Sequence, residues 1–117
     1  MAAGVVHIPW YATVFRGDRL EAALREIAPV ALRYGATRYL VYRNRDDMYK
    51  FLQTANFADK GDFEAYWYGP EFIDFRTIYQ GYYQVPVLYT WADLVIEGGI
   101  GEEPTVITGA PQEGDTV

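Results

Sequence analysis

The sequence predicts an α+β domain in which strands and helices follow the order βαββαβ. Three observations lead to this order. Two stretches carry apolar residues at helical spacing, four segments are rich in β-branched and aromatic residues, and a short polar turn joins two of those segments. With 117 residues, half of them hydrophobic, the chain is long enough for one domain with a substantial core.

The first half of the chain predicts a strand followed by a helix. Residues 5–15, VVHIPWYATVF, have the composition of a strand. Asp18 resembles the first residue of a capping box, because a glutamate follows three residues later. Apolar residues at helical spacing then predict a helix over 19–34, which Pro29 should kink or break. Gly35 is the residue type expected just after a helix end.

The second half repeats the pattern with a hairpin in front of it. Residues 37–43 and 48–57 read as two strands, and the polar turn NRDD between them predicts an antiparallel hairpin. Asp59 can cap a second helix, which the Gly69–Pro70 pair should divide into two pieces. Residues 85–91, VPVLYTW, predict the fourth strand. One such unit forms a four-stranded antiparallel sheet with both helices on one face.

Charge and composition divide the chain into a domain over residues 1–95 and a tail over 96–117. The tail is Gly-rich and acidic, and its segment 104–109, PTVITG, is compatible with one further short strand. The last 25 residues hold six acidic side chains and no Lys or Arg, whereas acidic and basic side chains balance in the rest of the chain. No basic footprint for phosphate backbones is present, so we expect no nucleic-acid partner.

Other classes are also disfavoured by composition. The chain has no cysteine, which excludes disulfides and thiolate chemistry. No window approaches 18 uncharged apolar residues, and the N-terminus has no basic region followed by a long apolar run, so we expect no membrane association. The expected location is the cytoplasm.

The predicted sheet has two apolar faces. Inward and outward positions of the first and fourth predicted strands both lack a charged, solvent-facing stripe. Two helices cover only one face, and a bare apolar face needs a cover. The simplest cover is a second copy of the chain, packed sheet to sheet about a two-fold axis.

The element order, the passage YRNRDDMYKFLQTANFADKGDFEAYW at 42–67 and the strand VPVLYTW resemble the dimeric α/β-barrel superfamily, which has a ferredoxin-like fold. Within it, the chain looks most like the antibiotic-biosynthesis-monooxygenase type, over residues 5–95. The resemblance implies a homodimer that oxygenates a phenolic or polyketide-like molecule without metal or flavin. The superfamily also contains haem-degrading enzymes, cyclases, isomerases and ligand-sensing regulators.

Histidine placement departs from many of these relatives, which carry a histidine in the second helix where this chain has Trp67 and Tyr68. Here His7 is the only histidine. One histidine with scattered carboxylates forms no ligand cluster, so the sequence predicts neither a metal site nor a haem ligand on a helix.

Two residues are candidates for catalysis. His7 could accept a proton from a phenol or enol near neutral pH, or it could be an ordinary imidazole at a strand end. Arg76 is the only Lys or Arg between Lys60 and the C-terminus, and it lies among many rings. It could pair with a phenolate or enolate, or it could form a surface salt bridge.

Aromatic and amide side chains are candidates for substrate binding. Trp67 could stack on a flat substrate, although packing in the core is the plainer role. The remaining candidates are polar side chains on the predicted strands and on the second helix: Tyr11, Tyr39, Asn56, Tyr68 and Tyr79. Asn56 could instead bond the backbone where the strand meets the helix.

Aromatic residues are concentrated in one part of the chain, because eleven of the twenty fall between residues 63 and 91. This concentration favours an aromatic-lined pocket for an aromatic small molecule. Three classes of function stay open: a cofactor-independent monooxygenase, a non-redox cyclase, isomerase or binder of the same fold, and an assembly module that uses the acidic tail.

Overall fold

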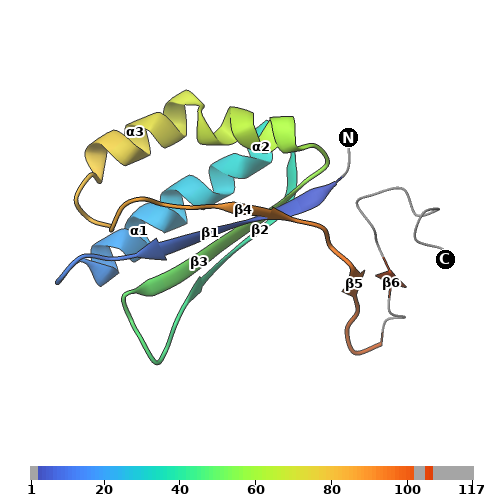
Figure 1. Cartoon of the computed structure of the whole chain (residues 1–117), viewed down its shortest axis with the longest axis horizontal. Coiled ribbons are helices and arrows are strands. Elements are labelled where there is room, and N and C mark those ends of the chain that lie inside the picture. The colour runs from blue at the N-terminus through green and yellow to red at the C-terminus, as the bar shows by residue number, and fades with distance from the viewer. Residues whose placement is uncertain (1–2, 102–104, 107–117) are drawn as a thin grey trace.

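The computed structural model describes residues 3–101 and 105–106 and shows the predicted α+β architecture (Figure 1). A four-stranded sheet carries all the helices on one face, and a small two-stranded hairpin lies beyond the end of the fourth strand. The elements are β1 (Gly4–Tyr11), α1 (Gly17–Ile27), the 3₁₀ helix η1 (Ala28–Tyr34), β2 (Ala36–Arg43), β3 (Lys50–Phe57), α2 (Lys60–Trp67), α3 (Pro70–Ile78), β4 (Thr90–Ala92), β5 (Ile96–Glu97) and β6 (Thr105–Val106).

The sheet has the strand order β2-β3-β1-β4, and every neighbouring pair is antiparallel. Consecutive β2 and β3 form the predicted hairpin, while the two crossovers that contain helices place β1 and β4 beside each other. The predicted fold class is therefore confirmed. The β5–β6 hairpin lies in the segment that the sequence assigns to the tail.

The first helix changes character where the sequence places its proline. α1 ends at Ile27, and the chain continues as a 3₁₀ helix with Pro29 in its first turn. Gly35 ends this helix with φ of 99°, a conformation that suits glycine. The capping prediction for Asp18 is wrong, because α1 begins at Gly17, the N-cap position is Arg16 and no side chain caps the helix. Asp18 instead accepts a hydrogen bond from Arg43.

The second predicted helix is divided into two helices, α2 and α3, in the structure. Asp59 caps α2 as predicted, by accepting a hydrogen bond from the backbone N–H of Gly61 at 3.0 Å. Gly69 separates α2 from α3 in a crowded position. A Cβ atom there would lie 2.6 Å from the Tyr34 hydroxyl and 2.7 Å from the Ala65 carbonyl oxygen. Only a residue without a side chain fits where the two helices meet.

The fourth strand is much shorter than the predicted 85–91. Regular pairing with β1 covers only Thr90–Ala92, and an isolated bridge joins Ala12 to Tyr83. Between these contacts β1 has four residues, 8–11, whereas the opposite chain has six, 84–89. The two surplus residues cannot fit a continuous ladder, so residues 84–89 run outside it.

The core fills the space between the helices and the sheet. Side chains of β1 and β3 alternate, so that Trp10 and Gln53 are buried under the helices while Tyr11 and Asn56 face the other way. Trp10 lies at the centre of this core, with ring centroids 4.9 Å from Tyr83, 5.5 Å from Phe75, 6.2 Å from Phe72 and 6.3 Å from Trp67. The inner layer of the domain is thus built mainly from aromatic rings.

No helix among the described residues has both the length and the apolar character needed to cross a bilayer.

Candidate functional site

An arginine side chain lies on an indole ring where α2 and α3 meet. The guanidinium carbon of Arg76 is 4.4 Å from the centroid of the Trp67 ring and 5.2 Å from that of Phe72. Its Nη2 atom donates a hydrogen bond of 2.7 Å to the carbonyl oxygen of Trp67, the last residue of α2. The break at Gly69 lets α3 bring its arginine back over the end of α2. This placement holds the cation against an aromatic face.

The other terminal nitrogen of Arg76 has no partner. Nη1 is the one buried side-chain nitrogen or oxygen atom within residues 3–101 that forms no hydrogen bond. Burial lowers the pKa of the guanidinium, which nevertheless stays a cation at neutral pH. Buried donors without a partner are rare and costly in native proteins, and a charged N–H binds an anionic oxygen strongly. An anionic oxygen that reached Nη1 would therefore be bound strongly.

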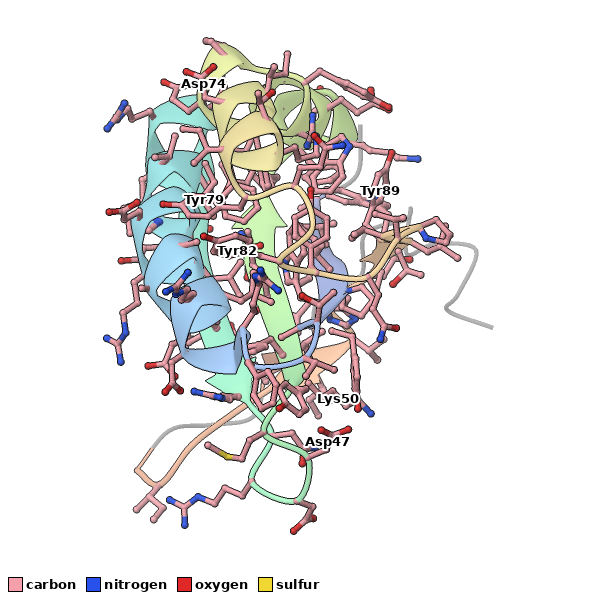
Figure 2. All side chains as sticks on the ribbon, turned by 90° about the vertical axis from the view of Figure 1, so that its left-hand side faces the viewer. Asp47, Lys50, Asp74, Tyr79, Tyr82 and Tyr89 are labelled. Carbon is pink, nitrogen blue, oxygen red and sulfur yellow. The ribbon has the colours of Figure 1, made fainter. Side chains whose placement is uncertain are left out.

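Two phenols lie near this cation, and a third packs on the same indole ring. Tyr68 and Tyr83 lie close enough to affect the charge of Arg76, and each raises its pKa. Burial raises the pKa of Tyr83 itself, so its hydroxyl stays protonated and can donate. Tyr89 packs its ring 5.4 Å from that of Trp67. Figure 2 shows Tyr89 on the side of α3 away from Tyr79 and Tyr82. We call Trp67, Tyr68, Arg76, Tyr83 and Tyr89 the arginine cluster.

A chain of buried hydrogen bonds fixes the rings beneath the arginine cluster. The Trp10 indole N–H donates to Gln53 Oε1 at 3.0 Å, and Gln53 Nε2 donates to the Tyr66 hydroxyl at 3.1 Å. That hydroxyl donates in turn to the carbonyl oxygen of Ile27 at 2.6 Å. Every polar atom of the chain is paired, which leaves the Trp10 ring in one orientation.

His7, the candidate base, does not lie at the arginine cluster. His7 sits on β1 between Val6 and Ile8, both buried under the helices, and so points to the opposite face of the sheet. It lines a hollow of about 460 Å³ there, together with Asn56. Tyr11 is on the same outer face, and its hydroxyl donates to Asp47 at 2.6 Å. The sheet therefore separates these three residues from Arg76.

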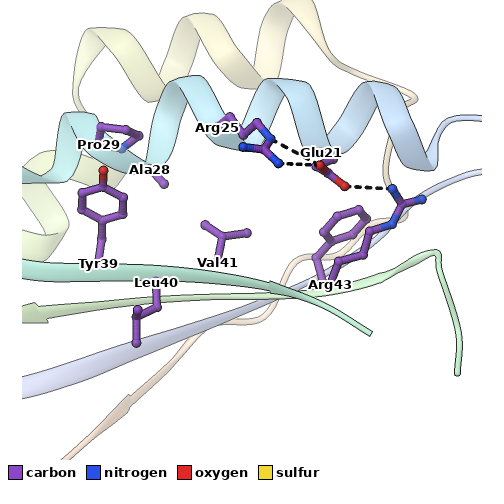
Figure 3. A pocket seen from close by; sticks show the side chains of 9 residues that line it. Glu21, Arg25, Ala28, Pro29, Tyr39, Leu40, Val41 and Arg43 are labelled. Carbon is purple, nitrogen blue, oxygen red and sulfur yellow. Dashed lines mark hydrogen bonds and ion pairs between the residues drawn. The ribbon is translucent and has the colours of Figure 1, made fainter. Parts of the chain in front are cut away.

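Two further candidates lie apart from the arginine cluster. Tyr39 lines a groove between α1 and β2, which we call the β2 groove (Figure 3). The Tyr79 hydroxyl is 3.3 Å from Glu26 Oε1 on α1, and its ring packs against Phe75 and Tyr82. Of the eight candidate residues, the structure brings Trp67, Tyr68 and Arg76 together on the helical side of the sheet, and His7 and Asn56 together on its outer face. The roles proposed for all eight stay predictions.

Sequence reasoning missed Tyr83 and Tyr89. Both fall in the ring-rich stretch 63–91, which was the available signal. The position of Tyr89 depends on residues 84–89 leaving the ladder, which the prediction of a regular strand over 85–91 concealed, whereas Tyr83 precedes that strand and pairs with Ala12. Within the described residues no group of three or more His, Asp or Glu side chains is arranged to hold a metal ion.

Comparison with solved structures gives the class of fold. The chain has the ferredoxin-like fold of proteins of the antibiotic-biosynthesis-monooxygenase type, in agreement with the resemblance seen in the sequence. No protein-family model matches the chain, and no curated protein sequence matches it.

Three structures illustrate the likeness. A candidate antibiotic biosynthesis monooxygenase from Nitrosomonas europaea has a TM-score of 0.70 and 14% identity over 77% of this chain and 88% of its own. SnoaB from Streptomyces nogalater, described as a cofactor-independent oxygenase, has a TM-score of 0.68 and 15% identity over 80% and 94%. A further candidate monooxygenase from Bordetella bronchiseptica has a TM-score of 0.71 and 11% identity over 81% and 99%. At these identities the likeness establishes the fold alone.

Proposed function

We propose that the chain is a cofactor-independent monooxygenase that binds the anion of a phenolic or polyketide-like molecule at the arginine cluster. The observation that carries this proposal is the buried Nη1 atom of Arg76, a charged donor without a partner among aromatic rings. The fold, shared with a protein described as a cofactor-independent oxygenase, supports the same class of activity.

The chemistry needs an electron-rich substrate more than it needs a protein base. A phenol or enol that binds beside a buried cation ionises more readily, because the guanidinium stabilises the anion. The anion then reacts with dioxygen. A ring CH₂ group of the substrate, or of the keto tautomer of a phenol, becomes C=O; one oxygen atom enters the product and the other leaves as water, so the substrate supplies all the electrons. Trp67 and Tyr89 would hold the flat ring system.

Oxygen consumption tests the proposal directly. Hydroxyanthrones and hydroxynaphthalenes, polycyclic phenols that ionise readily, should cause enzyme-dependent oxygen uptake with ketone or quinone formation. Arg76→Gln should lower kcat/KM by about 10²-fold, the usual effect of removing one donor to a developing oxyanion. Arg19→Gln is the matched control, since Arg19 is exposed on α1. Unchanged turnover in Arg76→Gln would place the chemistry elsewhere.

A second candidate function is non-redox cyclisation, isomerisation or binding at the same cluster. The observation that favours it is the position of His7 on the other face of the sheet, away from Arg76. Among the described residues, the titratable groups that affect the pKa of Arg76 are the tyrosines Tyr68 and Tyr83. Calorimetry under nitrogen separates the two candidates. Without oxygen, a binder keeps the same affinity for its ligand, and an isomerase or cyclase also forms the same product. A monooxygenase forms no product under nitrogen.

We also propose that two copies pair through the outer face of the sheet, where Leu40 and Leu52 are half-buried beside His7 and Asn56. This face has no helix over it, and a self-complementary pairing would cover it. The third class of function, assembly through the acidic tail, concerns residues of which 102–104 and 107–117 lie outside the described part of the chain.

A further inference from the structure

The β2 groove runs between the first helical segment and the edge of the sheet, with a volume of about 470 Å³ (Figure 3). Its helical wall consists of Glu21, Arg25 and Ala28, spaced three to four residues apart and so on one side of the helix, and of Pro29. Its other wall is β2, and Phe51 from β3 also lines it. The groove thus lies between a helical wall and a strand.

Main-chain atoms of β2 line this groove. Tyr39, Leu40 and Val41 all border it, although they are consecutive in a strand. Figure 3 shows Tyr39 and Val41 pointing toward the helix and Leu40 pointing away. Leu40 also borders the hollow on the outer face, so only its backbone can reach the groove. In the described sheet β2 pairs with β3 alone, and its other edge presents unpaired N–H and C=O groups.

The charges at the rim favour an acidic ligand. Two guanidinium groups and one carboxylate border the groove. Arg25 is 77% exposed and uses Nε and Nη2 for Glu21, so its Nη1 has no hydrogen bond to a described residue. Arg43 donates to Asp18 and Glu21 and stands 5.0 Å from the Phe51 ring centroid. Of the two arginines of β2, only Arg43 borders this groove, because Arg38 borders the hollow on the outer face, so the free cationic donor at the rim is Nη1 of Arg25.

We infer that the β2 groove binds an extended, acidic peptide segment of another protein, which adds to the sheet as a strand beside β2. Its backbone would pair with the free edge at Tyr39–Val41, and alternate apolar side chains would lie against Ala28, Pro29 and Val41. A carboxylate side chain of the peptide would reach Arg25. A row of alternating donors and acceptors suits an extended chain better than a compact small molecule.

The inference does not depend on the proposed oxygenase activity. The groove borders β2, at the edge of the sheet farthest from β4, whereas the arginine cluster involves α2, α3 and the segment before β4. A peptide bound at one site would leave the other open.

Amide hydrogen exchange of the full chain tests the inference, with the acetylated peptide EEVTITVS as the probe. We expect saturable binding that slows exchange in Tyr39–Val41, and weaker binding of the same peptide with lysines in place of its glutamates. Arg25→Glu should weaken binding at least about fivefold by charge repulsion, while Arg19→Glu, a matched change on the same helix, should alter it less than about twofold.

Three results would overturn the inference. The probe could fail to bind at millimolar concentration, it could protect the outer face around Leu52 instead of the β2 edge, or Arg25→Glu and Arg19→Glu could weaken it equally. Self-association of the chain through β2, seen as protection of Tyr39–Val41 that grows with protein concentration and no probe, would identify a second copy as the occupant and would also contradict it.

Discussion

The two faces of the sheet differ although the same strands build both. Toward the helices, Trp10 and Gln53 are fully buried, and the buried side-chain nitrogen and oxygen atoms of the described residues are paired except at Arg76 Nη1. Toward the other side, Tyr11 is exposed and Asn56 is half-buried in a mixed polar and apolar surface. The inner face forms the core of the domain, whereas the outer face has no helix over it. Neighbouring residues on one strand therefore make matched pairs for experiments.

The largest expected difference is between Trp10 and its neighbour Tyr11. Trp10→Ala should lower the free energy of unfolding by about 3–5 kcal/mol, because it leaves a cavity among the core rings. Tyr11→Ala removes an exposed ring and one hydrogen bond to Asp47, and should cost about 1 kcal/mol or less. Urea unfolding followed by circular dichroism measures both. Equal losses would contradict the distinction between the faces.

A smaller effect is expected for two amides on β3. Gln53→Leu leaves the buried Trp10 indole N–H without an acceptor and should cost about 1–3 kcal/mol. Asn56→Leu, on the outer face, should change stability by about 0.5 kcal/mol or less in the monomer. Unfolding should be measured at a protein concentration at which sedimentation shows monomer. A stable Gln53→Leu protein would mean that the buried network is dispensable.

Leu52→Glu tests whether the outer face joins two copies. A charge in such an interface should raise the dimer dissociation constant at least about tenfold, or about 1.4 kcal/mol. Sedimentation velocity over a dilution series measures it. Leu32→Glu is the control, since Leu32 is half-exposed on η1 and away from that face. If the wild-type chain stays monomeric over the whole dilution series, the outer face does not join two copies.

The smallest expected effect is a pH dependence at the rim of the β2 groove. Hydrogen bonds from Arg43 and Arg25 lower the pKa of Glu21 in the folded protein. The folded state thus gains stability that is fully present above the unfolded pKa of about 4.3 and is lost as pH falls through the lowered folded value. Glu21→Gln should make unfolding free energy fall less steeply below pH of about 4.5. Glu64→Gln, a change at an exposed site, should leave that slope unchanged.

Local patterns in the sequence predict much of this fold. Helical spacing, the cap at Asp59 and the turn glycine at Gly35 each depend on a few adjacent residues, and each agrees with the structure. Asp18 fails because a distant partner, Arg43, competes for its carboxylate. The short β4 fails because its extent depends on register with β1, a long-range property that no window of sequence contains.

The candidate site follows the same division. Arg76, Trp67 and Tyr68 are close in sequence, and the break between α2 and α3, which the Gly69–Pro70 pair predicts, brings them together. Tyr89 joins them because residues 84–89 leave the ladder, and Tyr83 because it forms a bridge with Ala12, and both are long-range features. The β2 groove is invisible to sequence reasoning, since it arises where the edge of a sheet meets the side of a helix.

Gly69 restricts how this chain can evolve. Its neighbours are the Ala65 carbonyl oxygen, which belongs to the α2 backbone, and the Tyr34 hydroxyl, which donates to Glu71 at 2.6 Å. Any mutation that adds a side chain must push α3 away from α2, and the hydrogen bond from Arg76 to the end of α2 spans that same junction. A substitution at Gly69 would therefore alter both the packing of α3 on α2 and the arginine cluster. Descendants that keep the arginine cluster should keep the glycine as well, however far the rest of their sequences diverge.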